Sequence, residues 1–138
     1  MEKIPSQKRT VVKRIVLFGP ESTGKTTLAK KLSEKYDVPW VAEYAREYLQ
    51  DKWDRSRAIC QPEDLVPIAI EQMKLENEAI IQAENEKKQF IVCDTDLLET
   101  LVYSEVYYNG WADQRLLDAV SSQNYDLYLL TGKIGRAH

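Results

Sequence analysis

Residues 19–26 read Gly-Pro-Glu-Ser-Thr-Gly-Lys-Thr, between an apolar run at 15–18 and a segment with helical spacing at 27–32. In a phosphate-binding loop of this form, backbone N–H groups and the positive end of the following helix surround the phosphates. The lysine reaches the outer phosphates and the hydroxyl next to it binds Mg²⁺. A simple glycine turn would leave the Lys-Thr-Thr order unexplained. The sequence therefore predicts that a nucleotide binds at Gly19, Pro20, Glu21, Ser22, Thr23, Gly24, Lys25, Thr26 and Thr27.

The composition is that of an ordinary soluble domain. Of the 138 residues 43% are apolar and 30% charged, and the formal net charge is -3, which suits one domain with a core. No apolar stretch of about 18 residues and no signal-peptide core is present, so we expect a cytoplasmic protein without a membrane or nucleic acid as partner. An early basic cluster indicates a solvated leader at 1–12 rather than a nucleic-acid arm: Lys3, Lys8, Arg9, Lys13 and Arg14.

Cysteine and histidine usage limits the chemistry. Cys60 lies in a polar segment and Cys93 in an apolar run, and we expect both to be reduced thiols in the cytoplasm. The single histidine, His138, is the last residue, which excludes a metal site built from histidines.

Apolar patterning predicts the order of the elements. Apolar runs predict strands at 11–18, 40–43, 90–93 and 127–130. Helical spacing and helix-start signals predict helices at 26–36, 44–49, 62–87, 97–108 and 113–121, and the charged stretch 51–61 is expected to be a loop. The long helix should turn inward Leu65, Ile68, Ala69, Gln72, Leu75, Ala79, Ile80 and Ala83. This alternation favours an α/β domain, a three-layer fold with a mostly parallel sheet.

Polar residues directly follow the predicted strands, where ligands of such sheets bind. Asp94 follows the third strand, and it is the candidate that binds Mg²⁺ together with Thr26, either directly or through another ligand of the ion, with a helix N-cap as the alternative. Asp96 suits a helix N-cap and a site role equally well.

Glu43 and Arg46 follow the second strand. The Glu43 carboxylate could take the proton of an acceptor hydroxyl as that oxygen bonds to phosphorus. Arg46, three positions later, could clamp a phosphate or pair with Glu43, and a plain surface ion pair is the alternative. With Lys25 and Asp94, these residues form the predicted catalytic set.

Aromatic residues gather in the same region: Trp40, Tyr44, Tyr48 and Trp53. Flat rings could stack on a heterocycle, although aromatics at this spacing are more often core. We predict substrate contacts for Trp40, Tyr44 and Asp96. The sequence contains no Asn-Lys-x-Asp guanine-reading motif, which disfavours a GTPase.

Four motifs in this order resemble the ribosylnicotinamide kinase domain of NadR-type proteins, over residues 13–131. They begin at residues 19, 43, 94 and 125, and they read GPESTGKTTL, EYAR, DTDLLET and YDLYLLT. The resemblance implies a P-loop kinase-like fold and Mg²⁺-dependent transfer of the γ-phosphate of ATP to the 5′-hydroxyl of nicotinamide riboside, for NAD salvage. It implies that Lys25 and Thr26 serve ATP and magnesium. Glu43, Arg46, Asp94 and Asp96 would face the riboside and the transferring phosphate. The DNA-binding and nucleotidyltransferase parts of multifunctional members have no counterpart in this sequence, so those activities are not carried over.

The resemblance stops after Thr131. In the family a lid with a phosphate-facing arginine follows, then a last strand and helix, whereas residues 132–138 here read Gly-Lys-Ile-Gly-Arg-Ala-His. The last five letters match one reading frame of a common sequencing-library adapter. We therefore expect a non-native tail at 132–138, and a domain at 13–131 that lacks the last lid, strand and helix. Such a chain should bind nucleotide weakly and turn over little. Genomic DNA that continued through His138 to a stop codon would refute the tail hypothesis.

Two other functions stay open. A kinase of the same architecture could act on another nucleoside or small molecule, because the aromatics do not identify a base. A regulatory protein could use the nucleotide as a conformational signal, although such a switch needs no acceptor-side carboxylate. The oligomeric state does not follow from the sequence.

Overall fold

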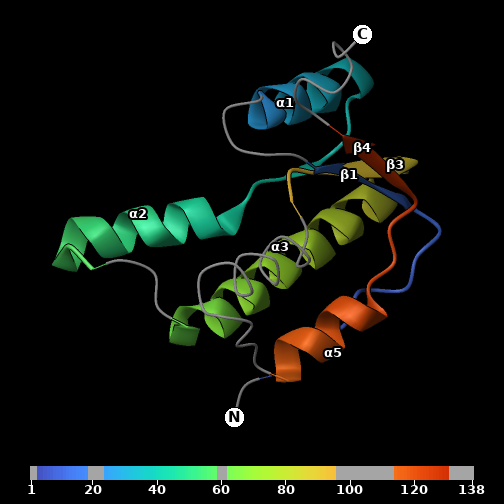
Figure 1. Cartoon of the computed structure of the whole chain (residues 1–138). Helices are drawn as coiled ribbons and strands as arrows, with labels where there is room; N and C mark the ends of the chain where they lie inside the picture. Colours follow the sequence, from blue (N-terminus) through green and yellow to red (C-terminus); the bar gives the residue numbers. More distant parts are fainter. Residues whose placement is uncertain (1–2, 19–23, 59–61, 96–113, 131–138) are drawn as a thin grey trace, which may run out of the picture. The chain divides into compact units, whose positions relative to one another are not determined.

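The computed structural model describes residues 3–18, 24–58, 62–95 and 114–130 (Figure 1). In chain order the elements are β1 (Lys13–Phe18), α1 (Lys25–Tyr36), β2 (Trp40–Val41), α2 (Tyr44–Ser56), the 3-10 turn η1 (Pro62–Asp64), α3 (Leu65–Asn85), β3 (Phe90–Cys93), α5 (Gln114–Ser122) and β4 (Leu127–Leu130). None of the helices in these ranges has the length and hydropathy needed to cross a bilayer.

The chain forms two compact units, and each is described by itself. The sheet unit comprises Lys8–Ala42, Glu76–Thr95 and Asn124–His138. The helical unit comprises Met1–Gln7, Glu43–Leu75 and Asp96–Gln123. Helix α3 therefore contributes its beginning to the helical unit and its end to the sheet unit.

The sheet has four strands, all parallel, in the order β2-β3-β1-β4. Its centre is β1, which pairs with β3 from Lys13↔Phe90 to Val16↔Cys93 and with β4 from Ile15↔Leu127 to Phe18↔Leu130. Val16 and Leu17 are fully buried, because a central parallel strand is covered on both faces. The strands predicted at 90–93 and 127–130 are confirmed.

Helices lie on both faces of the sheet. Leu17 and Val92 pack with Ala29 of α1, and Leu32 lies against the same cluster. Neighbouring residues of a strand point to opposite faces, so Cys93 faces away from α1, and there its thiol contacts Glu76 of α3. The sheet unit therefore has the predicted three layers.

The helical unit has its own apolar core. Ala69 and Met73 of α3 pack with Leu116 of α5, and both α3 residues are buried. Ile4 of the leader, Ala119 and Val120 lie against this cluster. The first residues of the chain are thus tied to the helical unit by an apolar contact.

Several predicted boundaries were wrong. β1 begins at Lys13 rather than at residue 11, because pairing with β3 starts there and Val11 is 91% exposed. The second strand contains only Trp40 and Val41, so Glu43 is the N-cap of α2 instead of a strand residue. The predicted helix 62–87 begins as η1 and its α-helical part ends at Asn85. The helix predicted at 97–108 lies outside the described residues.

The loop predicted at 51–61 was wrong for its first half, because α2 continues to Ser56. Its charges are spaced for a helix. Asp51 and Arg55 form an ion pair at 2.6 Å, and the amide of Gln50 donates to Asp54 at 3.0 Å. Pairs four residues apart stabilise a helix, so a charged segment that suggested a loop extends the helix.

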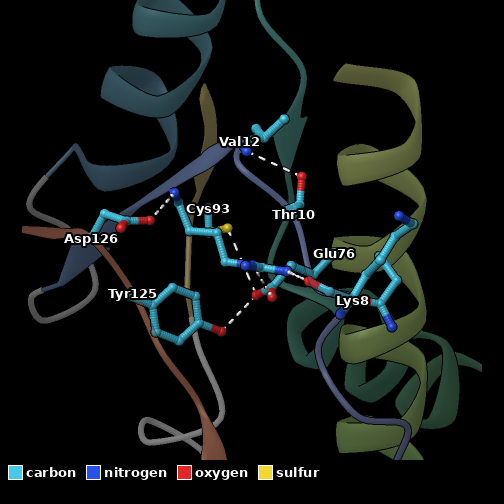
Figure 2. A network of polar contacts seen from close by, with 9 residues as sticks. Lys8, Thr10, Val12, Glu76, Cys93, Tyr125 and Asp126 are labelled. Atoms are coloured by element: carbon cyan, nitrogen blue, oxygen red, sulfur yellow. Dashed lines mark hydrogen bonds and ion pairs between the residues drawn. The ribbon is translucent and has the colours of Figure 1, made fainter. Parts of the chain in front are cut away.

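A buried polar network ties the layers of the sheet unit together around Glu76 of α3, which is 3% exposed (Figure 2). Arg14 of β1 donates from Nε to Glu76 Oε2 at 3.0 Å and from Nη2 to the carbonyl of Lys8 at 2.6 Å. The Tyr125 hydroxyl donates to Glu76 Oε1 at 2.6 Å, and the thiol of Cys93 approaches the same oxygen at 3.9 Å. Both carboxylate oxygens are therefore paired, which offsets the cost of burying the charge.

Replacement of Glu76 by leucine should destabilise the chain by about 3–5 kcal/mol, because it leaves the buried guanidinium of Arg14 without its counter-charge. The double variant Arg14→Met/Glu76→Leu should recover most of this loss. The free energy of unfolding in urea measures both effects. As a control, Lys13→Ala removes an exposed partner of Asp126 at 4.0 Å and should cost less than about 1 kcal/mol. Equal losses in the single and double Glu76 variants would contradict this account.

Candidate functional site

The described part of the phosphate-binding loop begins at Gly24, the N-cap of α1. Gly24 has φ 78° and ψ 17°, a left-handed conformation that a side chain would strain. A Cβ there would meet nothing within 4 Å, so the requirement for glycine is conformational rather than steric. Glycine also brings no side-chain oxygen to the first turn, and the positive end of α1 receives no cap from this residue. Gly19, Pro20, Glu21, Ser22 and Thr23 lie outside the described residues.

Three predicted site residues belong to the sheet unit and lie at the start of α1 and the end of β3. Lys25 is 3% exposed and Asp94 is 1% exposed. The hydroxyl of Thr26 donates to Asp94 Oδ2 at 2.8 Å. The backbone N–H of Asp94 donates to the carbonyl of Val41 at 2.8 Å, which fixes the turn out of β3. The two residues predicted to bind Mg²⁺ therefore lie within hydrogen-bond distance of one another, and their binding of the metal stays a prediction.

The second oxygen of the Asp94 carboxylate is the polar atom that suggests a ligand. Among the described residues, Oδ1 of Asp94 is the buried side-chain atom without a hydrogen-bond partner. Such an oxygen costs free energy unless a cation or a water approaches it. The residues fit Mg²⁺, since this ion prefers oxygen ligands and usually binds one or two protein groups together with phosphates and water. Thr26 Oγ1 and Asp94 Oδ1 would hold it.

Glu43 and Arg46 belong to the helical unit, at the start of α2. The Glu43 side chain is 9% exposed, and its Oε1 lies 3.9 Å from Nη2 of Arg46, whose side chain is 47% exposed. An ion pair at this distance with one exposed partner is weak. The ion pair that the sequence left open between these two residues is thus present, and a contact of Arg46 with a phosphate stays a prediction.

Tyr44 follows Glu43 and lies in acidic surroundings. Partial burial, followed by the carboxylates of Glu71, Glu47 and Asp51, raises the pKa of the Tyr44 phenol. Its ring centroid lies 6.0 Å from that of Tyr48. The Tyr44 hydroxyl therefore stays protonated at neutral pH, and the role of Glu43 as a base stays a prediction.

Trp40 lies against the core of the sheet unit, whereas Trp53 is an exposed residue of α2. Trp40 packs against the core cluster of the sheet unit, with Nζ of Lys30 5.8 Å from its ring centroid. Trp53 is 44% exposed. These contacts describe Trp40 as part of the core, and its contact with a substrate stays a prediction. Asp96 lies outside the described residues, so its role also stays a prediction.

Sequence reasoning missed one residue of the helical unit. Gln72 is expected on the inner face of α3 but was given no role, yet its side-chain carbonyl accepts the backbone N–H of Tyr44 at 2.8 Å. A polar residue at an inward-facing position was the available signal, since a buried amide needs a partner.

Comparison with known proteins places this geometry among related folds. A family model described as AAA domain matches residues 14–136. No curated protein matches the sequence. Crystal structures of NadR in complex with NR (nicotinamide riboside) and with NAD and AMP-PNP each superpose with a TM-score of 0.71 at 24% identity over 87% of the chain. Thymidylate kinase from Ehrlichia chaffeensis superposes with a TM-score of 0.57 at 21% identity, over 89% of the chain and 72% of its own.

The chain spans only 34% of the length of the NadR chains. These similarities show the fold, and the predicted P-loop kinase-like α/β architecture is confirmed.

Asp94→Asn should separate stability from ligand binding. The variant keeps the acceptor for Thr26 and removes a buried charge, so we expect the ligand-free chain to unfold at the same or a higher temperature. The gain in AMP-PNP affinity that Mg²⁺ provides should fall roughly ten- to a hundredfold. Calorimetry with and without Mg²⁺ measures this gain, and Asp118→Asn on the exposed side of α5 is the control. Undiminished Mg²⁺ dependence in Asp94→Asn would exclude the proposed ligand.

Proposed function

The chain belongs to the AAA domain family, whose model matches residues 14–136, and on this basis we propose that it is a P-loop nucleoside kinase. The reaction is transfer of the γ-phosphate of ATP to the 5′-hydroxyl of nicotinamide riboside. The product is nicotinamide mononucleotide, a step of NAD salvage.

One observation carries the proposal. Thr26 lies at the start of the helix that follows the phosphate-binding loop, and its hydroxyl contacts the buried Asp94 at 2.8 Å. The second oxygen of that carboxylate has no hydrogen-bond partner among the described residues. A buried carboxylate oxygen without a partner is costly unless a ligand approaches it, and it suits a cation that arrives with a nucleotide.

The donor half of the reaction uses the sheet unit. Lys25 would neutralise charge on the outer phosphates, and Thr26 and Asp94 would hold the metal. Bound Mg²⁺ supplies charge neutralisation on the phosphate oxygens. Since little covalent chemistry is required of the protein, positioning and electrostatic stabilisation account for most of its contribution.

The acceptor half uses the start of α2. The 5′-oxygen of the riboside bonds to the γ-phosphorus, the bond from that phosphorus to the bridging oxygen of ADP breaks, and the hydroxyl proton passes to Glu43. Arg46 would bind the transferring phosphate, because its guanidinium can donate two hydrogen bonds to phosphate oxygens and its side chain is 47% exposed at the start of α2. A protein that used its nucleotide only as a signal would not need such a pair.

The choice of riboside rests on the fold comparison and on the four motifs. The NadR complexes that superpose on this chain contain nicotinamide riboside in one case and AMP-PNP in another. Thymidylate kinase superposes less closely, so thymidylate is an informative competitor beside free nucleosides such as thymidine.

Calorimetric titration of the chain with nicotinamide riboside, in the presence of Mg²⁺ and AMP-PNP, tests the proposal. We expect binding of the riboside and much weaker binding of thymidine and uridine. Phosphoryl transfer by this chain is expected to be slow, and Glu43→Gln should lower its rate further by roughly a hundredfold or more. Glu47→Gln, one turn further along α2, should leave that rate within about twofold. Preferential binding of thymidine would favour the other nucleoside kinases, and nucleotide binding without any nucleoside would favour a regulatory protein.

A further inference from the structure

Helix α2 is attached to the helical unit by polar contacts. None of its residues from Tyr44 to Ser56 is buried, so apolar packing contributes little to its position. Instead, Tyr44, Tyr48 and Lys52 each contact the η1–α3 segment through a polar atom. These residues are spaced four apart and therefore share one face of α2.

The middle of α2 is held by one carboxylate. Asp64 is 5% exposed and ends η1. Its Oδ1 accepts the Tyr48 hydroxyl at 2.9 Å and its Oδ2 accepts Nζ of Lys52 at 2.6 Å. Both oxygens are used, which fixes this part of α2 against the beginning of α3.

The N-terminus of α2 is held by Gln72. This side chain is 5% exposed, and its Oε1 accepts the backbone N–H of Tyr44, the first residue of the helix. Backbone N–H groups in the first turn have no partner within their own helix. An N-cap side chain usually accepts from the second or third residue of the helix, but Glu43 at this position makes no capping hydrogen bond. Gln72, from a neighbouring helix, satisfies the N–H of the first residue.

Glu43 is the N-cap residue, but its carboxylate does not cap α2, although acidic residues at this position commonly accept from N–H groups of the first turn. The backbone that carries Glu43 is nevertheless fixed, because the next N–H along the chain is bonded to a buried group. Gln72 therefore fixes the backbone beside Glu43, while the Glu43 carboxylate makes no capping hydrogen bond.

We propose that Gln72 is a positioning residue for the acceptor substrate: its side-chain carbonyl fixes the start of α2 and thereby sets where Glu43 and Arg46 meet the nucleoside. The inference rests on the proposed function, since it assigns Gln72 a part in the same reaction. Gln72 acts through the Tyr44 amide.

Three variants test it in the full chain. Gln72→Met keeps the size of the side chain and removes the acceptor. Gln72→Glu keeps an oxygen acceptor at the same place, whether its carboxyl is charged or neutral. Gln82→Met makes the same exchange on the exposed side of α3, where the Gln82 amide donates to Glu86 at 3.3 Å. Calorimetry gives the dissociation constants of nicotinamide riboside and of AMP-PNP with Mg²⁺, and hydrogen exchange reports the Tyr44 amide.

We expect Gln72→Met to weaken riboside binding about fivefold or more, the effect of losing one helix cap. Binding of AMP-PNP should stay within about twofold of the original value, because a capping loss of this size is confined to α2. Exchange of the Tyr44 amide should accelerate, Gln72→Glu should restore both readouts, and Gln82→Met should change neither.

Parallel loss of both ligands together with a lower melting temperature would mean that Gln72 is only structural, and it would overturn the inference. Unchanged riboside affinity in Gln72→Met, with riboside bound normally by the original chain, would overturn it as well while the proposed function stands. Absence of nucleoside binding in the original chain would overturn the proposed function and this inference with it.

Discussion

Parallel pairing of β1 with β3 is the constraint on which the donor half of the site depends. Val16 lies opposite Cys93 in this ladder, so the two strands end at the same edge of the sheet. The chain leaves β1 into the phosphate-binding loop and leaves β3 into Asp94. Because both exits are at one edge, Thr26 and Asp94 come within 2.8 Å although 68 residues separate them. The β2–β3 pairing adds the bond from the Asp94 amide to Val41 and fixes the same turn.

Two buried carboxylates of the sheet unit, Glu76 and Asp94, differ in whether both of their oxygens are hydrogen-bonded. Glu76 is fully paired, with Arg14 on one oxygen and Tyr125 on the other. Asp94 is as deeply buried, but one of its oxygens has no partner in the described part of the chain. The satisfied carboxylate joins β1, α3 and the segment before β4, and is structural. The unsatisfied one lies beside the phosphate-binding loop, where an incoming cation can complete it.

The helical unit carries Glu43 and Arg46 at the start of α2, a helix that buries none of its own residues. Directional contacts from Gln72 and Asp64 replace apolar packing there. Hydrogen bonds specify position more sharply than apolar contact does, since they require a particular geometry as well as proximity. Such an attachment suits the role in nucleoside binding that we propose for the first turn of α2.

The sequence by itself determined the α/β class, the order along the chain of the four strands of the described sheet, and the places of Thr26 at the start of a helix and of Asp94 directly after a strand. These follow from local information, since strand periodicity, the glycine-lysine-threonine order and the residues that follow strands are readable within a short window. The sequence misplaced Glu43, which is the N-cap of α2 and not part of the second strand. Local charge misled at 51–56, where pairs four residues apart extend α2. Only the tertiary structure decided which side chains contact one another. It shows that Oδ1 of Asp94 has no hydrogen-bond partner in the described residues and that Arg14 is buried against Glu76. It also shows that Gln72 accepts from the first N–H of α2. Those contacts join residues far apart in the chain, and their formation depends on strand register and helix placement, which no local pattern encodes.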